Sequence, residues 1–302
     1  MKMWHDDSPK PRAFLRTLLI AVAISGCTRS PEIVDRPQLS PQVHLLDATV
    51  HSAILSHDLP LRIIVPSSPP KGDMLPVVYL LHGAGQNNHD WSNHSAIATF
   101  AAQNVVLVMP EAENSFYMNE ASGTDRRYED YLVQEVLPEV HRLVPYAASD
   151  RAHNAIVGIS RGGFGAVDIA LRHPQLFSFV GDFSGALDLA QRPLRLRAPL
   201  DSFAFRRAFG VEGSATRRET DPFMLLEHVS PQDAPYFFIA CGNKDSLLRV
   251  NQRFAATLAQ HGYGFEAHEL DGGHDWKTWN AALPAMEAAL IAHFKQSASP
   301  AP

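Results

Sequence analysis

The chain has 302 residues, of which 45% are apolar, and its formal net charge is −6. This length allows one large α/β domain or two small ones with a sizeable core. The acidic balance lacks the basic patch that nucleic-acid binding needs, so we expect no nucleic-acid partner. The 15 histidines are scattered without metal-ligand spacing, and we predict no metal site and no organic cofactor.

The first 26 residues have the composition of an export signal. Lysines and arginines precede an apolar run at residues 17–26, which has the length of a signal-peptide core and is too short to span a bilayer. The run leads into Ile-Ser-Gly-Cys, which resembles the lipobox of bacterial lipoproteins and implies cleavage before Cys27 and an acylated N-terminus. We therefore expect an exported protein that is lipid-anchored to a bacterial membrane. An ordinary secretory signal or an uncleaved anchor is the alternative.

Residues 27–42 contain three prolines among polar residues and show no apolar periodicity. They are predicted to form a tether between the membrane and the folded domain. The second cysteine, Cys241, ends the apolar run YFFIAC, so we expect a small buried side chain there. If Cys27 is lipidated, Cys241 has no partner for an intramolecular disulfide.

From residue 43 onwards, apolar runs of strand length alternate with segments of helical periodicity. Strands are predicted at residues 50–55, 61–65, 77–81, 105–109, 155–159, 177–183, 236–241 and 265–270. Helices are predicted at residues 97–103, 129–143, 164–171, 246–260 and 277–294, with Pro138 and Pro284 interrupting two of them. This alternation implies an α/β fold with a mostly parallel central sheet and helices on both faces. We expect one domain over residues 43–296 and a disordered tail at 297–302.

A long insertion at about residues 185–232 lacks clear periodicity. Because loops beyond the carboxyl ends of strands surround the ligand in sheets of this kind, we expect the insertion to form one wall of the site. Its arginines could line a pocket for anionic substrates, but a solvated surface is the favoured interpretation. These arginines are Arg192, Arg195, Arg197, Arg206, Arg207, Arg217 and Arg218.

The hexapeptide GISRGG, residues 158–163, lies between a predicted strand and a predicted helix. Its GxSxG pattern is typical of a sharp strand-to-helix turn, in which glycines are needed because a Cβ would collide with neighbouring elements. Such a turn exposes Ser160 as a nucleophile. A serine hydroxyl is a weak nucleophile by itself, so it needs a histidine base and a carboxylate that orients the histidine.

The carboxylate and the histidine are expected at later strand ends, in the order Ser, acid, His. Asp245 follows the strand YFFIAC by four residues, and His274 follows the last strand in the segment DGGHDW. Asp182 and Asp271 are weaker candidates for the acid. Asp245 has a structural alternative as the N-cap of the helix predicted from residue 246, and the two roles are compatible.

The negative oxygen of a tetrahedral intermediate needs two N–H donors, and losing one such donor typically costs roughly 2.7–4 kcal/mol of barrier stabilisation. The backbone N–H of Arg161 is the first predicted donor. The loop LLHGAGQN, residues 80–87, follows an apolar strand and contains glycines that allow amides to point inward. Ala84 or Gly83 is predicted to supply the second donor, and a plain tight turn is the alternative.

Together these segments resemble the bacterial putative-esterase family, which includes esterase D, the antigen 85 mycolyltransferases, enterochelin and feruloyl esterases and tributyrin esterase. The resemblance runs from about residue 43 to 294 and rests on seven segments: PVVYLLHGAGQNNHDW, VVLVMPEAENSFY, YEDYLVQEVLPEV, GISRGGFGA, DFSGALD, CGNKDSLL and GGHDWKTW. It implies an α/β-hydrolase fold with Ser160 as nucleophile, Asp245 as acid and His274 as base. It also implies an oxyanion hole at the N–H groups of Ala84 and Arg161.

Two departures from the family pattern bear on specificity. The residue after the nucleophile, often methionine in close relatives, is Arg161, whose side chain could brace the site or contact substrate. The stretch GQNNHDW lacks the cysteine of the S-formylglutathione hydrolase branch, which speaks against glutathione thioester chemistry. Phe116, Tyr117, Trp276 and Trp279 are predicted to shape the acyl pocket, with core packing as the alternative.

The sequence predicts a serine esterase that hydrolyses small-molecule or lipid esters through an acyl-enzyme. Ser160, His274 and Asp245 form the predicted catalytic triad. The first alternative is an acyltransferase of the mycolyltransferase type, which has the same triad and uses a sugar or lipid hydroxyl as acceptor. The second is a non-catalytic surface-binding module on the same fold.

Overall fold

The computed structural model describes residues 35–123, 125–193 and 199–297, without the side chains of residues 199–202 and 297. The predicted signal segment, Cys27 and the tail from residue 298 lie outside these ranges. The chain from Asp35 onwards forms one unit. In the part described, no helix is both long and apolar enough to cross a membrane.

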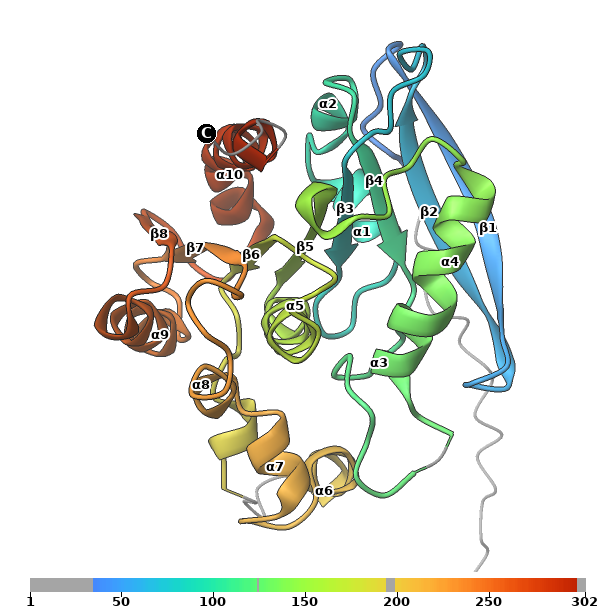
Figure 1. The fold of residues 1–302 in the computed structure, drawn as a ribbon. Helices are drawn as coiled ribbons and strands as arrows, with labels where there is room; N and C mark the ends of the chain where they lie inside the picture. The colour runs from blue at the N-terminus through green and yellow to red at the C-terminus, as the bar shows by residue number, and fades with distance from the viewer. Residues whose placement is uncertain (1–34, 124, 194–198, 298–302) are drawn as a thin grey trace, which may run out of the picture. The chain divides into compact units, whose positions relative to one another are not determined.

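An eight-stranded sheet has the strand order β1-β2-β4-β3-β5-β6-β7-β8 (Figure 1). Strands β1 and β2 form an antiparallel hairpin, β2 pairs antiparallel with β4, and all other neighbours are parallel. The prediction of a mostly parallel sheet is therefore confirmed. The strands are β1 (Val43–Ser52), β2 (His57–Pro66), β3 (Val77–Leu81), β4 (Val106–Pro110), β5 (Asn154–Ile159), β6 (Phe179–Phe183), β7 (Tyr236–Gly242) and β8 (Phe265–Leu270).

Helices cover both faces of the sheet, as predicted, because the central strands are apolar on both sides. In β3, Val77 and Tyr79 belong to one core cluster, whereas Val78 and Leu80 belong to another. The first cluster includes residues of α3, α4, α5 and α9, and the second includes residues of α1, α2 and α10. These helices are α1 (Asp90–His94), α2 (Ala98–Ala101), α3 (Tyr128–Asp130), α4 (Leu137–Leu143), α5 (Arg161–Arg172), α9 (Leu248–His261) and α10 (Trp276–Ser297).

The β1–β2 hairpin corrects one predicted boundary. The sequence predicts a strand at residues 50–55, but β1 ends at Ser52 and the chain turns before β2. The prediction is wrong there because Leu55 is apolar without being part of a strand: it lies in the turn and packs into the core with 3% exposure. Ser56 completes the turn with a φ of 60°.

The last part of the predicted tether, residues 35–42, is bound to the domain. The Gln38 N–H donates to the Ser92 carbonyl at 2.8 Å. Asp35 forms an ion pair of 2.7 Å with Arg62, whose side chain is fully buried. The predicted boundary of the tether at residue 42 is therefore wrong. Polar residues of this segment, which the sequence pattern assigns to the tether, make specific contacts with the folded domain.

The helix predicted at residues 129–143 is continuous but irregular. A π-helical segment, Tyr131–Val136, joins α3 to α4. Pro138 lies in the first turn of α4, and the widened turns before it accommodate its missing N–H. Pro284 lies inside α10, which continues past it to Ser297.

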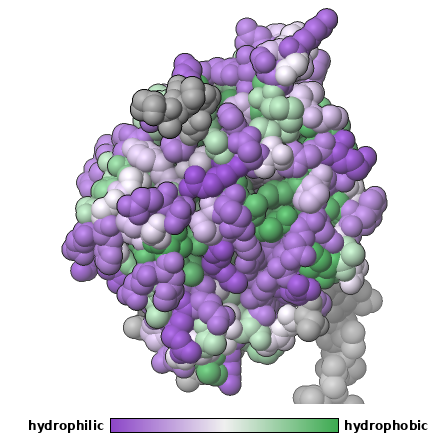
Figure 2. Space-filling model, in the orientation of Figure 1, coloured by the Kyte–Doolittle hydropathy of each residue, from purple (hydrophilic) through white to green (hydrophobic). Residues whose placement is uncertain are grey.

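The described part of the insertion contains three α-helices where the sequence shows no periodicity: α6 (Pro199–Phe209), α7 (Ala215–Glu219) and α8 (Pro222–Leu225). Two of them are too short to display a helical repeat. Phe209 of α6 packs with Phe116 and Phe164 in a third apolar cluster. Phe203 and Val211 stay 67% and 50% exposed. Figure 2 shows a mainly hydrophilic face of the molecule, broken by separate apolar patches.

Several arginines of the insertion are structural. Arg217 is 5% exposed and donates to two backbone carbonyls, that of Arg192 at 2.7 Å. Arg207 forms an ion pair of 2.7 Å with Glu120, whose side chain is almost fully buried. The expectation of a solvated surface is therefore wrong for Arg217. Arg195 and Arg197 lie outside the described residues.

Candidate active site

Ser160 lies in a sharp turn between β5 and α5. Its φ is 55° and its ψ is −113°, a backbone conformation that is costly for a residue with a Cβ. Two glycines make room for this turn. A Cβ on Gly158 would lie 2.1 Å from the Gly162 carbonyl oxygen, and one on Gly162 would lie 2.4 Å from the Leu81 carbonyl oxygen. The strand, turn and helix predicted around GISRGG are confirmed.

Three side chains from three strand ends form a continuous hydrogen-bonded chain. His274, in the loop after β8, places Nε2 2.9 Å from Ser160 Oγ and Nδ1 2.7 Å from Asp245 Oδ2. Asp245 lies in the loop after β7, and its side chain is fully buried, whereas that of His274 is 36% exposed. The structure thus brings together the residues predicted as nucleophile, base and acid.

Asp245 is also held by the backbone. Its Oδ1 accepts the N–H of Leu247 at 2.9 Å. Helix α9 begins at Leu248 and has no side-chain cap, so the predicted N-cap role is wrong by two residues. The Leu247 bond fixes the carboxylate while its other oxygen bonds to His274.

The weaker candidates for the acid have other surroundings. Asp271 is exposed and pairs with Lys244 at 2.9 Å. Asp182, in β6, is 1% exposed, and a Cβ on Gly163 of the turn would come within 2.7 Å of its Oδ1. Burial, together with the nearby charge of Asp245, raises the pKa of Asp182 to about 7. A buried carboxyl group therefore lies directly behind the Ser160 turn.

The loop after β3 distinguishes the two predicted oxyanion donors. The Gly83 N–H donates to Gln86 Oε1 at 2.7 Å and is therefore occupied. Ala84 is exposed in the same loop, and its N–H has no hydrogen-bond partner among the described residues. Arg161 is the first residue of α5, where an N–H has no acceptor within the helix. Ala84 and Arg161 remain as the candidate donors.

Two aromatic side chains fix the backbone that leads into this loop. The Tyr117 hydroxyl donates to the His82 carbonyl at 2.9 Å, and Trp91 Nε1 donates to the Leu81 carbonyl at 3.1 Å. Tyr117 is only 1% exposed, so its predicted place in the pocket wall is wrong. It supports the loop instead. Sequence reasoning missed this role because 35 positions separate Tyr117 from the carbonyl that it bonds.

Tryptophan rings lie beside His274. Trp279 meets the imidazole edge-on, with ring centroids 5.1 Å apart, and its Nε1 donates to Ser184 Oγ at 3.1 Å. Trp276 contacts Trp279 at 5.3 Å and Trp91 at 5.4 Å between centroids. Trp279 is 5% exposed and belongs to the core, whereas Trp276 is half-buried and stays a predicted pocket residue.

The Arg161 side chain is bound to the loop after β4. Its Nη1 donates to the carbonyls of Asn114 at 3.0 Å and Ser115 at 3.3 Å, and to Asn114 Oδ1. Its guanidinium carbon lies 4.5 Å from the centroid of the Phe116 ring. Arg161 therefore braces the loop that carries Phe116, the other predicted pocket residue, which is 9% exposed.

The amino-acid sequence is similar to those of known proteins. A family model with the description "Putative esterase" matches residues 52–290. The chain belongs to this esterase family. An acetyl esterase of Caldicellulosiruptor saccharolyticus is 26% identical over 78% of this chain and 94% of that protein. The diacylglycerol acyltransferase/mycolyltransferase Ag85B of Mycobacterium avium is 24% identical over 94% of this chain and 96% of its own length.

Solved structures show the same fold. A fluorophosphonate-binding serine hydrolase of Staphylococcus aureus has a TM-score of 0.69 at 26% identity, over 83% of this chain and 98% of its own. A ferulic acid esterase has a TM-score of 0.70 at 24% identity, over 84% of this chain and 99% of its own. The predicted α/β-hydrolase fold is confirmed. With its family membership, this makes the protein an enzyme, a carboxylic ester hydrolase of the serine hydrolase class.

Proposed function

We propose that the protein hydrolyses carboxylic esters through an acyl-enzyme formed on Ser160, with His274 as base and Asp245 as the orienting acid. The observation that carries the proposal is the continuous chain from Asp245 Oδ2 through the imidazole to Ser160 Oγ, with steps of 2.7 and 2.9 Å. Both distances are within hydrogen-bond reach, as nucleophile activation requires.

Each residue of this chain has a defined task. His274 takes the Ser160 proton as the oxygen attacks the ester carbonyl, and it then protonates the leaving alcohol. Asp245 keeps the proton of the imidazole on Nδ1 and stabilises the imidazolium. The N–H groups of Ala84 and Arg161 bind the oxyanion of the tetrahedral intermediate. A water molecule, activated by His274, attacks the acyl-enzyme and releases the acid.

The test combines chemical labelling with turnover. We expect a fluorophosphonate probe to label wild type at Ser160, and 4-nitrophenyl acetate to be hydrolysed. Ser160→Ala should lose labelling and about 10⁴- to 10⁶-fold in kcat. Circular dichroism and the thermal midpoint of the variant serve as controls for folding. Turnover by Ser160→Ala at the wild-type rate contradicts the proposal.

Acyl transfer is a second candidate for the same acyl-enzyme. It is favoured by the alignment with the mycolyltransferase Ag85B, which extends over 94% of this chain. In that case a sugar or lipid hydroxyl replaces water in the second half-reaction. Product analysis with glycerol, glucose or trehalose as added acceptor separates the two: transfer that exceeds hydrolysis at millimolar acceptor supports a transferase, and hydrolysis alone supports an esterase.

For localisation, we propose export and lipidation of Cys27. The proposal rests on the sequence, where an apolar run leads into Ile-Ser-Gly-Cys. Cys27→Ser should move the protein from the membrane fraction to the soluble fraction and abolish metabolic labelling with a fatty acid. A Cys241→Ser variant is the matched control, because Cys241 is buried in β7 and should leave fractionation unchanged. Unchanged fractionation of Cys27→Ser contradicts lipid anchoring.

A further inference from the structure

Arg161 carries a positive charge and directly follows the proposed nucleophile, Ser160, in the sequence. Within the part of the chain that the structure describes, Nη1 is the one guanidinium nitrogen that forms hydrogen bonds, and its acceptors are the neutral oxygens of Asn114 and Ser115. Nε and Nη2 have no hydrogen-bond partner among the described residues. Arg161 is half-buried, so part of the side chain stays accessible.

No described carboxylate neutralises the charge of Arg161. Among the described side chains, no carboxylate lies within ion-pair distance of its guanidinium. Burial lowers the pKa of Arg161, and the nearby Tyr117 phenol opposes that effect only in part. An arginine stays protonated at neutral pH even so. A half-buried cation that only neutral carbonyls solvate gains most from an anion that approaches it.

The nearest acid in the same loop is engaged elsewhere. Glu113 directly precedes Asn114, but its carboxylate accepts the Tyr128 hydroxyl and lies 3.3 Å from His57 Nε2. Arg126 also approaches it at 4.0 Å. Glu113 therefore does not serve as the counter-ion of Arg161.

The guanidinium is held in place before any ligand arrives. Three hydrogen bonds fix Nη1, and the Phe116 ring lies 4.5 Å from the guanidinium carbon. Immobilising a long side chain in advance reduces the entropy that binding costs. Arginine also presents its N–H donors as a planar fork, which matches the two oxygens of a carboxylate.

We propose that the Arg161 guanidinium binds a carboxylate carried by the ester substrate, so that the enzyme prefers anionic esters to neutral esters of the same shape. This inference rests on the proposed function, because it assigns the substrate class of the Ser160 site. Nε and Nη2 supply the donors to the substrate, and Nη1 stays with the loop after β4.

The test compares matched esters that differ by one charge. The first pair, 4-nitrophenyl hydrogen adipate and 4-nitrophenyl hexanoate, places the charge on the acyl side. The second pair, 4-acetoxybenzoate and 4-acetoxybenzamide, places it on the alcohol side. For each pair, the ratio of kcat/KM for the anionic ester to that for the neutral ester is measured in wild type, Arg161→Lys and Arg161→Met. Any general damage to the Ser160 turn lowers both members of a pair and cancels in the ratio.

We expect the ratio to fall about 10- to 100-fold in Arg161→Met for at least one pair, which is the range for hydrogen bonds to charged groups. Arg161→Lys should keep part of the preference because it keeps the charge and loses the fork. The wild-type preference should also weaken as the salt concentration rises. Ratios that agree within twofold between wild type and Arg161→Met, in both pairs, overturn the inference.

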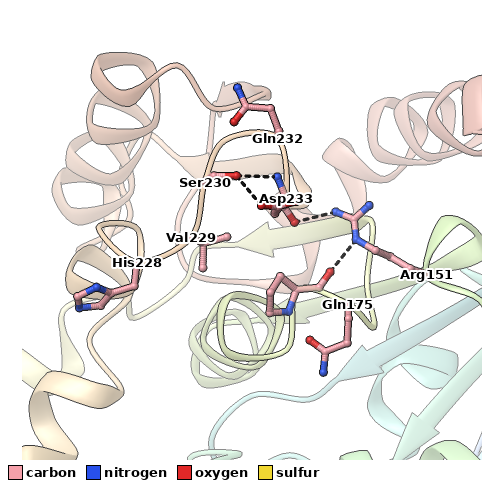
Figure 3. Close-up of a pocket in the computed structure, with 8 residues that line it drawn as sticks. Arg151, Gln175, His228, Val229, Ser230, Gln232 and Asp233 are labelled. Carbon is pink, nitrogen blue, oxygen red and sulfur yellow. Dashed lines mark hydrogen bonds between the residues drawn. The ribbon is translucent and has the colours of Figure 1, made fainter.

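Arg151 provides a matched control, because it is also held by backbone carbonyls. It donates to the carbonyls of Pro174, Asp233 and Ala234. Arg151 and Asp233 line a pocket of about 390 Å³ (Figure 3). It precedes β5, whereas Arg161 follows that strand. We expect Arg151→Met to leave both ratios at the wild-type value. A fall as large as that in Arg161→Met would overturn the inference, since it would reflect net charge alone.

A binding measurement separates this inference from the proposed mechanism. In Ser160→Ala, which cannot form an acyl-enzyme, calorimetry measures the binding of adipate and 4-hydroxybenzoate. We expect binding of at least one of them, weakened tenfold or more when Arg161→Met is added. Absent or equal binding overturns the carboxylate site. If wild type is not labelled by the fluorophosphonate probe and does not turn over esters, the proposed function is overturned, whatever the calorimetry shows.

Discussion

The two ends of strand β5 each carry an arginine bound to backbone carbonyls, yet the surrounding structure differs. At the carboxyl end, Ser160 has a positive φ, as do Ser184 after β6 and Glu113 and Tyr117 after β4. Arg151, at the amino end, clamps two loops beside an open pocket. Strained backbone, each instance costing of order 1–3 kcal/mol, is therefore concentrated at the edge that holds the proposed triad.

The two edges of the sheet therefore have different roles. At the carboxyl edge, the buried strands fix loops whose backbone adopts positive φ angles, and the His274 side chain stays 36% exposed. At the amino edge, Arg151 donates hydrogen bonds to three backbone carbonyls. Substitutions at the first edge should therefore remove activity, and those at the second should remove stability.

Among the substitutions that compare the two edges, the largest effect is expected at Asp245. Asp245→Asn should lower kcat about 10⁴-fold, because an amide no longer holds the imidazole in the productive tautomer. Ester turnover and the thermal midpoint are measured together. Asp271→Asn, in the neighbouring loop, is the control and should stay near the wild-type rate, since Asp271 pairs only with Lys244 among the described ion pairs. Equal losses in both variants would contradict the assignment of the acid.

The second effect concerns the room around the Ser160 turn. Gly158→Ala brings a Cβ within 2.1 Å of the Gly162 carbonyl oxygen, so the backbone must move. We expect the free energy of unfolding to fall by about 3 kcal/mol or more, with loss of turnover. Gly264→Ala, just before β8, meets two ring carbons of Tyr236, at 3.1 and 3.6 Å, and should cost less than about 1 kcal/mol. Denaturant unfolding decides, and equal costs would contradict the comparison.

The third prediction uses the buried carboxyl group behind the turn. The pKa of Asp182 is raised by burial to about 7, above its unfolded value of 3.8, so protonation favours the folded state. This contribution is present at low pH and is lost as the pH rises from about 4 through 7. Asp182→Asn cannot ionise. Its thermal midpoint relative to wild type should therefore increase over that range, and a difference that is constant with pH would contradict the burial of a titrating acid.

The smallest effect is expected at the amino edge. Arg151→Met removes donors from three carbonyls and should lower the free energy of unfolding by about 1 to 2 kcal/mol. Turnover of 4-nitrophenyl acetate at 25 °C should match wild type. A loss of kcat at unchanged stability would show that the two ends of β5 are coupled in function.

The sequence was sufficient to predict the three residues of the hydrogen-bonded chain. Ser160 and Asp245 each follow an apolar strand, and His274 follows the last strand, β8. Parallel strands bring such positions to one edge of the sheet. Strand positions were predicted for the same reason. The exception, residues 50–55, arose because an apolar residue can be buried in a turn as well as in a strand.

Contacts made by side chains across long sequence separations could not be predicted. The choice between Gly83 and Ala84 depends on Gln86, whose amide oxygen occupies one N–H. The bracing by Arg161 depends on carbonyls 46 and 47 positions away. Helices α7 and α8 of the insertion escaped detection because they have five and four residues, less than two turns each.

The three tryptophans of the described residues form a chain of ring contacts. The ring centroids of Trp91 and Trp276 are 5.4 Å apart, those of Trp276 and Trp279 are 5.3 Å apart, and Trp279 contacts His274. Intrinsic fluorescence of the folded domain therefore originates beside the proposed active site. Tryptophan fluorescence should therefore change on acylation and on ligand binding, and stopped-flow measurements can follow this change without an added dye. The same placement makes emission a poor gauge of events at the amino edge of the sheet.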